Sequence, residues 1–153
     1  MPLRFSIALV LSLVCPVVPA WADYHAGIAA NNRGDYATAL REWRPLAEQG
    51  HAVAQYSLGL LYANGQGVPK DDAQARQWYE KAAAQGSRYV QGWLGLIYAN
   101  GRGMPQDLVQ AHLWLSMAAA QGNKMARQER NKVIMKMTPA QVAEAQRLAQ
   151  EWE

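Results

Sequence analysis

The chain has 153 residues, with 15 lysine and arginine residues against 12 aspartate and glutamate residues. A formal charge of only +3 disfavours nucleic acid as the partner, and a single cysteine excludes an intrachain disulfide. The length suits one domain with its own hydrophobic core.

Residues 1–22 predict a secretory signal peptide. Arg4 gives a basic start, residues 5–14 form an apolar run, and Ala20-Trp21-Ala22 places small residues where a signal peptidase cleaves, before Asp23. The run is too short to span a bilayer, which makes a retained membrane anchor the less favoured alternative.

The cysteine, Cys15, follows Val14, and valine in that place disfavours lipidation. We therefore expect a periplasmic or secreted mature chain of residues 23–153, without a transmembrane segment. Because export removes the cysteine, this chain has to rely on helix packing for its stability.

Residues 23–50 predict a shortened pair of helices. Asn32-Arg33-Gly34 makes a tight turn, and Asp35 is suited to cap a second helix over residues 36–49. Pro45 lies inside that helix, where it removes one hydrogen bond.

Two longer copies follow, over residues 51–86 and 87–122, with a period of 36 positions. Period-matched pairs are Gly59 and Gly95, Tyr62 and Tyr98, Gly67 and Gly103, Pro69 and Pro105, Asp71 and Asp107, Ala75 and Ala111, and Gly86 and Gly122. A fixed period of this size predicts a solenoid of stacked helical units.

Each copy predicts two helices joined by a turn that contains two glycines. Asp71 and Asp107 are suited to cap the second helices. Gly59 and Gly95 fall inside the first helices, where glycine costs about 1 kcal/mol relative to alanine. Their recurrence predicts a close approach between helices.

These residues resemble the Sel-one-like repeat, a relative of the tetratricopeptide repeat. The match reads A-x-A-Q-Y-x-L-G-x-x-Y-x-x-G-x-G-V-x-x-D over Ala52–Asp71 and A-x-x-W-Y-x-K-A-A-x-Q-G over Ala75–Gly86. The resemblance implies an all-α fold, a right-handed α-solenoid of stacked antiparallel helix pairs. It also implies a scaffold that binds macromolecules, in bacteria often in the cell envelope.

Residues 123–153 depart from the repeat and predict C-terminal capping helices, which brings the expected total to about eight. Thr138 is suited to cap the last helix. Its apolar stripe comprises Val142, Ala145, Leu148, Ala149 and Trp152. The stripe either covers the preceding helix, as terminal repeats cap a solenoid core, or awaits a partner.

The sequence predicts no catalytic residue, no metal site and no cofactor. The histidines His25, His51 and His112 share no ligand spacing, and the serines Ser57, Ser87 and Ser116 lie in no nucleophile motif. A weak envelope hydrolase of peptidoglycan or β-lactams is an alternative that needs one of these serines beside a histidine or lysine in a cleft. Four C-terminal methionines suit core filling better than copper binding.

By analogy with the superfamily, a protein or peptide partner is expected on the concave face lined by first helices. Positions counted from Gly27, Gly59 and Gly95 place twelve residues there. Three of them are small, Ala63, Gly92 and Ala99; the nine candidate binding residues are Tyr24, Ile28, Asn31, Asn32, Tyr56, Leu60, Asn64, Leu96 and Asn100. The recurrent asparagines either bind an extended peptide backbone or simply end their helices.

Two further surfaces remain open. Six tryptophans and seven tyrosines suit a glycan-binding module, although most occupy repeat positions typical of a core. The basic segment 124–136 is either a solvated face or a surface that meets an anionic polymer, lipid or protein.

Overall fold

The computed structural model describes residues 22–151, and every regular element in that range is an α-helix. Most of the predicted signal peptide therefore lies outside the described residues. The helices are α1 (Tyr24–Asn32), α2 (Tyr36–Glu48), α3 (Ala52–Asn64), α4 (Asp72–Ala84), α5 (Arg88–Asn100), α6 (Leu108–Ala120), α7 (Lys124–Ile134) and α8 (Pro139–Gln150). Within this range, no helix combines the length and apolar character that crossing a membrane requires.

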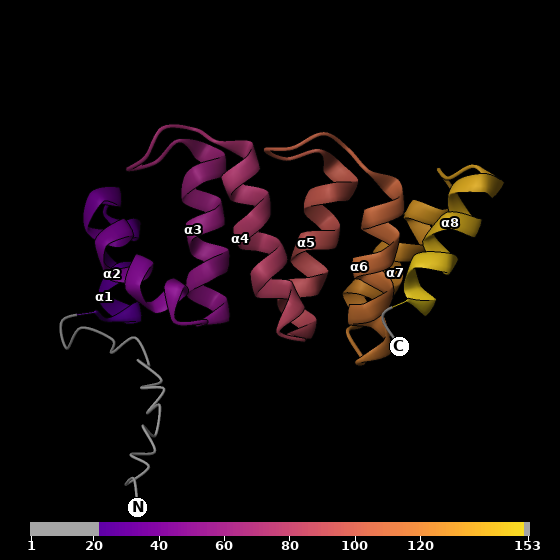
Figure 1. Cartoon of the computed structure of the whole chain (residues 1–153), viewed down its shortest axis with the longest axis horizontal. Helices are drawn as coiled ribbons and strands as arrows, with labels where there is room; N and C mark the ends of the chain where they lie inside the picture. Colours follow the sequence, from indigo (N-terminus) through magenta and orange to yellow (C-terminus); the bar gives the residue numbers. More distant parts are fainter. Residues whose placement is uncertain (1–21, 152–153) are drawn as a thin grey trace, which may run out of the picture.

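The helices follow one another along the long axis of the molecule, from α1 and α2 at one end to α8 at the other (Figure 1). Each of α1, α3 and α5 packs against the even-numbered helix that follows it, and α2, α4 and α6 also contact the next odd-numbered helix. This is an α-solenoid of antiparallel helix pairs, as the 36-residue period predicted.

Three glycines allow the two helices of a pair to approach closely, which confirms the prediction for Gly59 and Gly95. A Cβ atom on Gly59 would lie 2.4 Å from a ring carbon of Tyr79, and one on Gly95 would lie 2.6 Å from Cγ of Leu115. Gly27 meets the ring of Trp43 in the same way. Each glycine therefore receives a large side chain from the second helix of its pair.

Aspartate caps begin the second helices as expected. The Asp71 carboxylate accepts a hydrogen bond from the N–H of Gln74, and Asp107 accepts one from Gln110, both at 3.0 Å. The turns before them reach back along the solenoid. A Cβ atom on Gly103 would lie 3.0 Å from Cβ of Ala63, so the α5–α6 turn rests on the end of α3.

Buried glutamines join successive helix pairs. Gln55 on α3 donates to the carbonyl of Ala47 on α2 and accepts from Gln85 at the end of α4. Gln91 repeats this arrangement with Ala83 and Gln121. Because these side-chain amides bond to helix-end carbonyls inside the core, they fix the position of each helix pair relative to the preceding pair.

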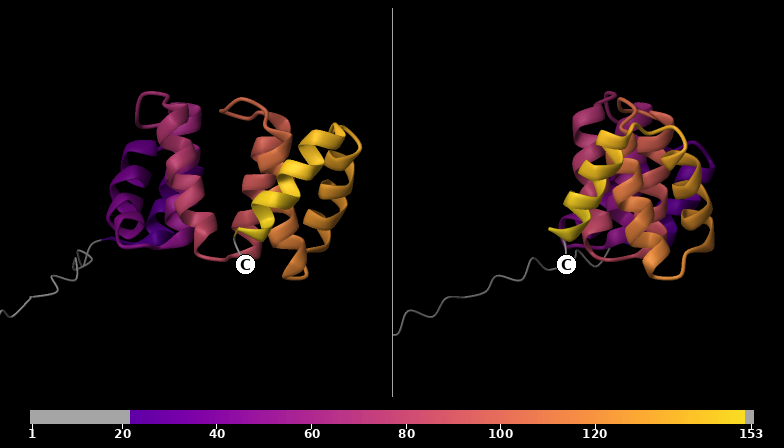
Figure 2. Two further views of the ribbon diagram at one scale, coloured as in Figure 1. Left: turned by 45° about the vertical axis from the view of Figure 1, so that its right-hand side comes forward. Right: turned by 90° about the vertical axis from the view of Figure 1, so that its right-hand side faces the viewer.

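The last helix, α8, begins with the predicted cap, in which Thr138 and Gln141 bond each other reciprocally. It crosses the end of the molecule obliquely (Figure 2). Ala145 of its stripe is fully buried and Val142, Leu148 and Ala149 are half-buried, but α8 packs mainly against α6. The expectation that it would cover the preceding helix, α7, was therefore wrong: α7 turns its buried Ala126 and Val133 to the core, leaving α6 available to α8. Trp152 lies outside the described residues.

Candidate binding surface

The exposed large apolar side chains of residues 22–151 gather on one set of helices. Val53 and Leu60 lie on α3, Tyr89 and Trp93 on α5, and Met125 and Ile134 on α7, with Met135 directly after it. Within the same range, none lies on α2, α4, α6 or α8. We call the exposed surface of α1, α3, α5 and α7 the odd-helix face.

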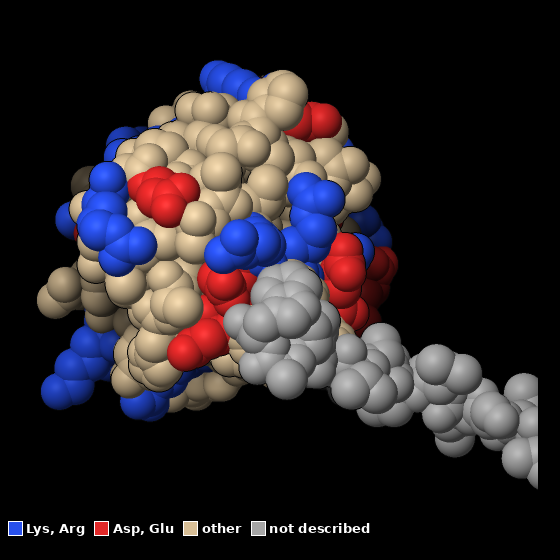
Figure 3. Space-filling model, turned by 90° about the vertical axis from the view of Figure 1, so that its left-hand side faces the viewer, with Lys and Arg blue, Asp and Glu red and all other residues tan. Residues whose placement is uncertain are grey.

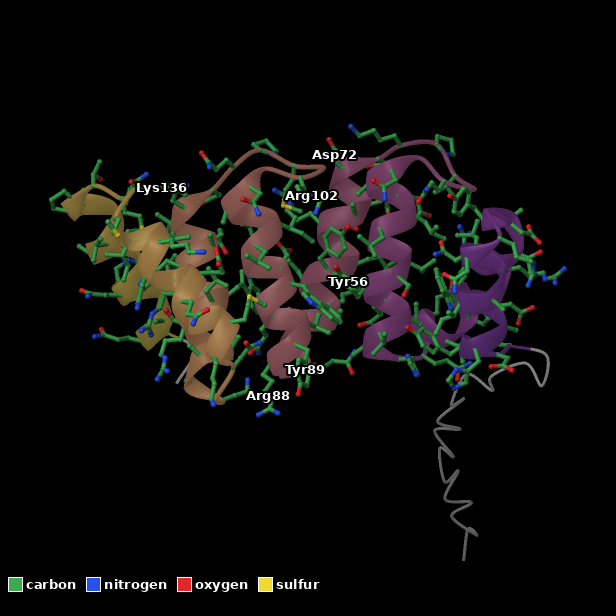
Figure 4. The ribbon with its side chains drawn as sticks, turned by 180° about the vertical axis from the view of Figure 1, so that it is seen from behind. Tyr56, Asp72, Arg88, Tyr89, Arg102 and Lys136 are labelled. Atoms are coloured by element: carbon green, nitrogen blue, oxygen red, sulfur yellow. The ribbon has the colours of Figure 1, made fainter. Side chains whose placement is uncertain are left out.

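A hollow of about 140 Å³ opens on this face between α3 and α5. The α3 wall is Tyr56, Leu60, Ala63 and Asn64; the opposite wall is Ile97, Arg102 and Gly103, and Tyr79 of α4 also contributes. Figure 4 shows Tyr56 between the two helices with Arg102 above it, while Arg88 and Tyr89 lie at the other end of α5. The predicted residues Tyr56, Leu60 and Asn64 thus come together in one site.

Three aromatic rings form a row beside the hollow. The ring centroid of Tyr56 lies 5.4 Å from that of Tyr79 and 4.8 Å from that of Trp93. Burial raises the pKa of the Tyr56 and Tyr79 hydroxyls, and the charge of Arg102 opposes that effect. Both hydroxyls therefore stay protonated and can donate hydrogen bonds.

The remaining predicted site residues do not join this hollow. Tyr24 stacks on His51 with ring centroids 5.1 Å apart, and Ile28 packs on the core of α1–α3. Asn31 and Leu96 are half-buried, whereas Asn32 and Asn100 are exposed.

The recurrent asparagines lie where the first helices end. Asn64 donates to Gln66 in its own turn, at 3.4 Å. Asn32, Asn64 and Asn100 are the last residues of α1, α3 and α5, which agrees with the alternative that they end their helices.

Sequence reasoning missed Tyr89, Trp93 and Arg102. Tyr89 and Trp93 precede the predicted Leu96 and Asn100 at helical spacing and complete one stripe along α5. Extending the prediction by two helical turns would have found both aromatic residues. Arg102 lies in a turn, and only the return of that turn over α3 brings it to the hollow.

For the hydrolase alternative, one candidate serine does lie beside a histidine. Ser116 Oγ lies 3.5 Å from Nδ1 of His112, one turn away on α6, which is long for a hydrogen bond between a nucleophile and its base. Burial lowers the pKa of His112, with a smaller contribution from Arg130. Neither Ser116 nor His112 lines the hollow between α3 and α5.

The structure also places the C-terminal methionines and the basic residues of α7. Met117 and Met137 pack on the core, whereas Met125 and Met135 are exposed. No group of metal-ligating side chains occurs within residues 22–151. On the basic helix α7, Lys132 pairs with Glu129, while Lys124 and Arg127 are exposed beside a small hollow at its start.

The fold and the repeated turns define an α-solenoid repeat protein. The sequence model of the Sel1 repeat family matches residues 52–87 and 89–123, which correspond to α3–α4 and α5–α6. A Sel1 repeat protein of Oxalobacter formigenes, of known crystal structure, is 38% identical with a TM-score of 0.58, and the match covers 71% of this chain and 85% of that one. The chain belongs to the Sel1 repeat family.

A second crystal structure extends the likeness. It is that of a protective antigen present in uropathogenic Escherichia coli strains, which displays an SLR fold. The two are 33% identical with a TM-score of 0.73 over 84% of this chain, which spans only 28% of the antigen. A comparison with curated proteins gives no significant match. Sel1 repeats typically mediate protein interactions, and such scaffolds are generally non-catalytic.

Proposed function

We propose that this protein is an exported, non-enzymatic scaffold that binds a protein or peptide partner on its odd-helix face. The main observation that supports this proposal is the distribution of exposed large apolar side chains. They lie on or directly after α3, α5 and α7 and not on the described even-numbered helices. Apolar side chains gathered on one face of a soluble domain mark an interaction surface.

The odd-numbered and even-numbered helices also differ in charge. The odd-numbered helices contain a single acidic residue, Glu129, against five basic residues: Arg88, Lys124, Arg127, Arg130 and Lys132. On the even-numbered helices acidic and basic residues balance. At the end of the molecule formed by α1 and α2, side chains of both signs are interspersed with uncharged surface (Figure 3).

Export is part of the proposal because of the predicted signal peptide. The test is to recover the protein from the envelope fraction and to determine its N-terminus by mass spectrometry, where Asp23 is expected. A chain that remained in the cytoplasm with Met1 intact would contradict export without affecting the proposed surface.

The binding face can be tested with Trp93→Ser, which removes an exposed aromatic side chain from α5. The control is Gln77→Ser, at an exposed position of α4. Gln77→Ser should melt like the wild type, and Trp93→Ser, which loses a ring contact with Tyr56, should melt lower but remain folded at the temperature of the experiment. After crosslinking in cells, partners should be captured by the wild type and the control but reduced severalfold by Trp93→Ser. Equal capture by both variants would contradict the proposed face. Binding to purified peptidoglycan sacculi in place of proteins would favour the glycan-binding alternative.

A further inference from the structure

The hollow between α3 and α5 offers hydrogen-bond donors that have no partner within residues 22–151. Tyr79 is only 1% exposed, yet it lines the hollow and its hydroxyl makes no hydrogen bond there. The Tyr56 hydroxyl and the Arg102 guanidinium also lack one. Because these donors face the hollow, a ligand that supplies hydrogen-bond acceptors can bond to them there.

The backbone around Arg102 is fixed although its side chain is free. Gly101 and Gly103 on either side adopt positive φ, and the Arg102 N–H donates to the carbonyl of Ile97 at 3.3 Å. Gly103 in turn lies against Ala63. The turn therefore carries a cation to the rim of a hollow formed mainly by the preceding repeat.

The surrounding charges favour an anion. Two acidic residues lie at or near this turn, and both are engaged. Asp107 at its end accepts a hydrogen bond from the N–H of Gln110. Asp72, whose Oδ1 would lie 3.8 Å from a Cβ atom on Gly103, lies 3.9 Å from Nζ of Lys70. Neither α3 nor α5 contains an acidic residue. An arginine with tyrosine hydroxyls beside it suits a carboxylate, which accepts hydrogen bonds only.

Apolar surface flanks the hollow. Leu60 forms part of one wall and is 37% exposed. Trp93, whose ring is tilted by 31° against that of Tyr56, is 38% exposed. Tyr89 continues this surface along α5 at 56% exposure. The residues on either side of a bound carboxylate would therefore meet leucine and aromatic side chains.

We propose that this hollow holds one aspartate or glutamate side chain from an extended acidic segment of a partner protein, with apolar neighbours of that residue on Leu60 and Trp93. The carboxylate accepts from Arg102 and from the Tyr56 and Tyr79 hydroxyls. The volume of about 140 Å³ admits one side chain, since a cavity of about 150 Å³ holds a benzene molecule. This inference rests on the proposed function and names the chemistry of its partner.

The probes are three matched sets of short synthetic peptides with random apolar flanks and a central glutamate, glutamine or lysine. Binding to the full chain is measured by fluorescence polarisation. Glutamate peptides should bind about tenfold more tightly than glutamine peptides, because a charge-assisted hydrogen bond is lost in the latter. Lysine peptides should bind most weakly.

Arg102→Gln is the decisive variant, because the equivalent position of the preceding repeat is already glutamine, Gln66. The control Arg33→Gln removes the same charge from an exposed turn away from the hollow. Arg102→Gln should abolish the preference for glutamate, and Arg33→Gln should leave it unchanged. Equal losses in both variants would indicate general attraction between charges and overturn the carboxylate site.

Two other outcomes would also overturn this inference: equal affinity for glutamate and glutamine peptides, or no binding of glutamate peptides to the wild-type chain. Neither would contradict the proposed function, which depends on whether Trp93→Ser reduces capture of the natural partner. Conversely, a glutamate preference that Arg102→Gln abolishes but Trp93→Ser leaves intact would support the carboxylate site and limit the binding face to the hollow.

Discussion

The two full repeats, α3–α4 and α5–α6, are built alike where helices pack. Their glycines Gly59 and Gly95 each receive a side chain from the partner helix, and their caps Asp71 and Asp107 make hydrogen bonds of equal length. Where the repeats face solvent they differ. The positions that maintain the scaffold recur with the period. Around the hollow, Leu60 and Asn64 recur as Leu96 and Asn100, whereas Tyr56 and Arg102 have no counterpart in the other repeat.

The most instructive difference is between Tyr56 and Gly92, which occupy equivalent positions. Tyr56 lines the hollow, whereas a Cβ atom on Gly92 would lie 3.8 Å from Cβ of Ala126, so α7 packs against α5 at that point. One repeat thus leaves an opening beside its first helix, and the next closes it with the following helix. Gly92, which counting from Gly95 assigned to the free concave face, belongs to this helix contact.

The largest expected effect is the loss of a packing position common to both repeats. Gly95→Leu should lower the free energy of unfolding by about 3 kcal/mol, because its Cβ already meets Leu115 side-chain and backbone atoms. Thermal and urea unfolding measure the change. Ala84→Leu, on an exposed site of α4, is the control and should have little effect. A wild-type midpoint for Gly95→Leu would contradict the contact.

A smaller effect should separate two equivalent tyrosines. The Tyr98 hydroxyl donates to Oε1 of Glu80 at 2.7 Å, whereas the Tyr62 hydroxyl accepts from the exposed Arg44 at 3.3 Å. Tyr98→Phe should cost about 1.5 kcal/mol, as for a half-buried hydrogen bond to a charged group, and Tyr62→Phe less than about 0.5 kcal/mol. Equal costs in urea unfolding would show that the two repeats do not differ here.

The same tyrosine gives a pH dependence. Burial, and then the hydrogen bond and charge of Glu80, raise the pKa of Tyr98 above its usual range. The unfolded chain therefore loses this proton first as the pH rises above about 10, so the free energy of unfolding should fall there. Tyr98→Phe should fall less steeply than the wild type, and parallel curves would contradict the assignment.

The smallest effect should show the repeats to be equivalent. Asp71→Ala and Asp107→Ala each remove an N-cap and should each cost about 1 kcal/mol. The two caps share no hydrogen-bond partner, so the double variant should cost about their sum. Urea midpoints of the three variants provide the test. A cost confined to one cap would indicate that one helix end finds a replacement partner.

The sequence by itself determined the helices, their order and their ends. Aspartate caps, glycine turns and a proline at the start of α8 act within a few residues, so their effects can be predicted locally. The 36-residue period also predicted the glycine contacts. Glycine weakens a helix, so its recurrence at one helical position indicates that close packing requires it there. Part of the hollow followed as well, since Tyr56, Leu60 and Asn64 share one face of α3.

Only the tertiary structure decided the rest. Gln55 and Gln91 are polar residues in apolar helices, and their role depends on carbonyls at the end of the preceding helix pair. The docking of α8 on α6 and the position of Arg102 over α3 likewise join segments remote in sequence. A helical pattern gives the face of the helix on which a side chain lies. Which neighbour packs against that face depends on how whole helices stack. No local sequence pattern contains that information.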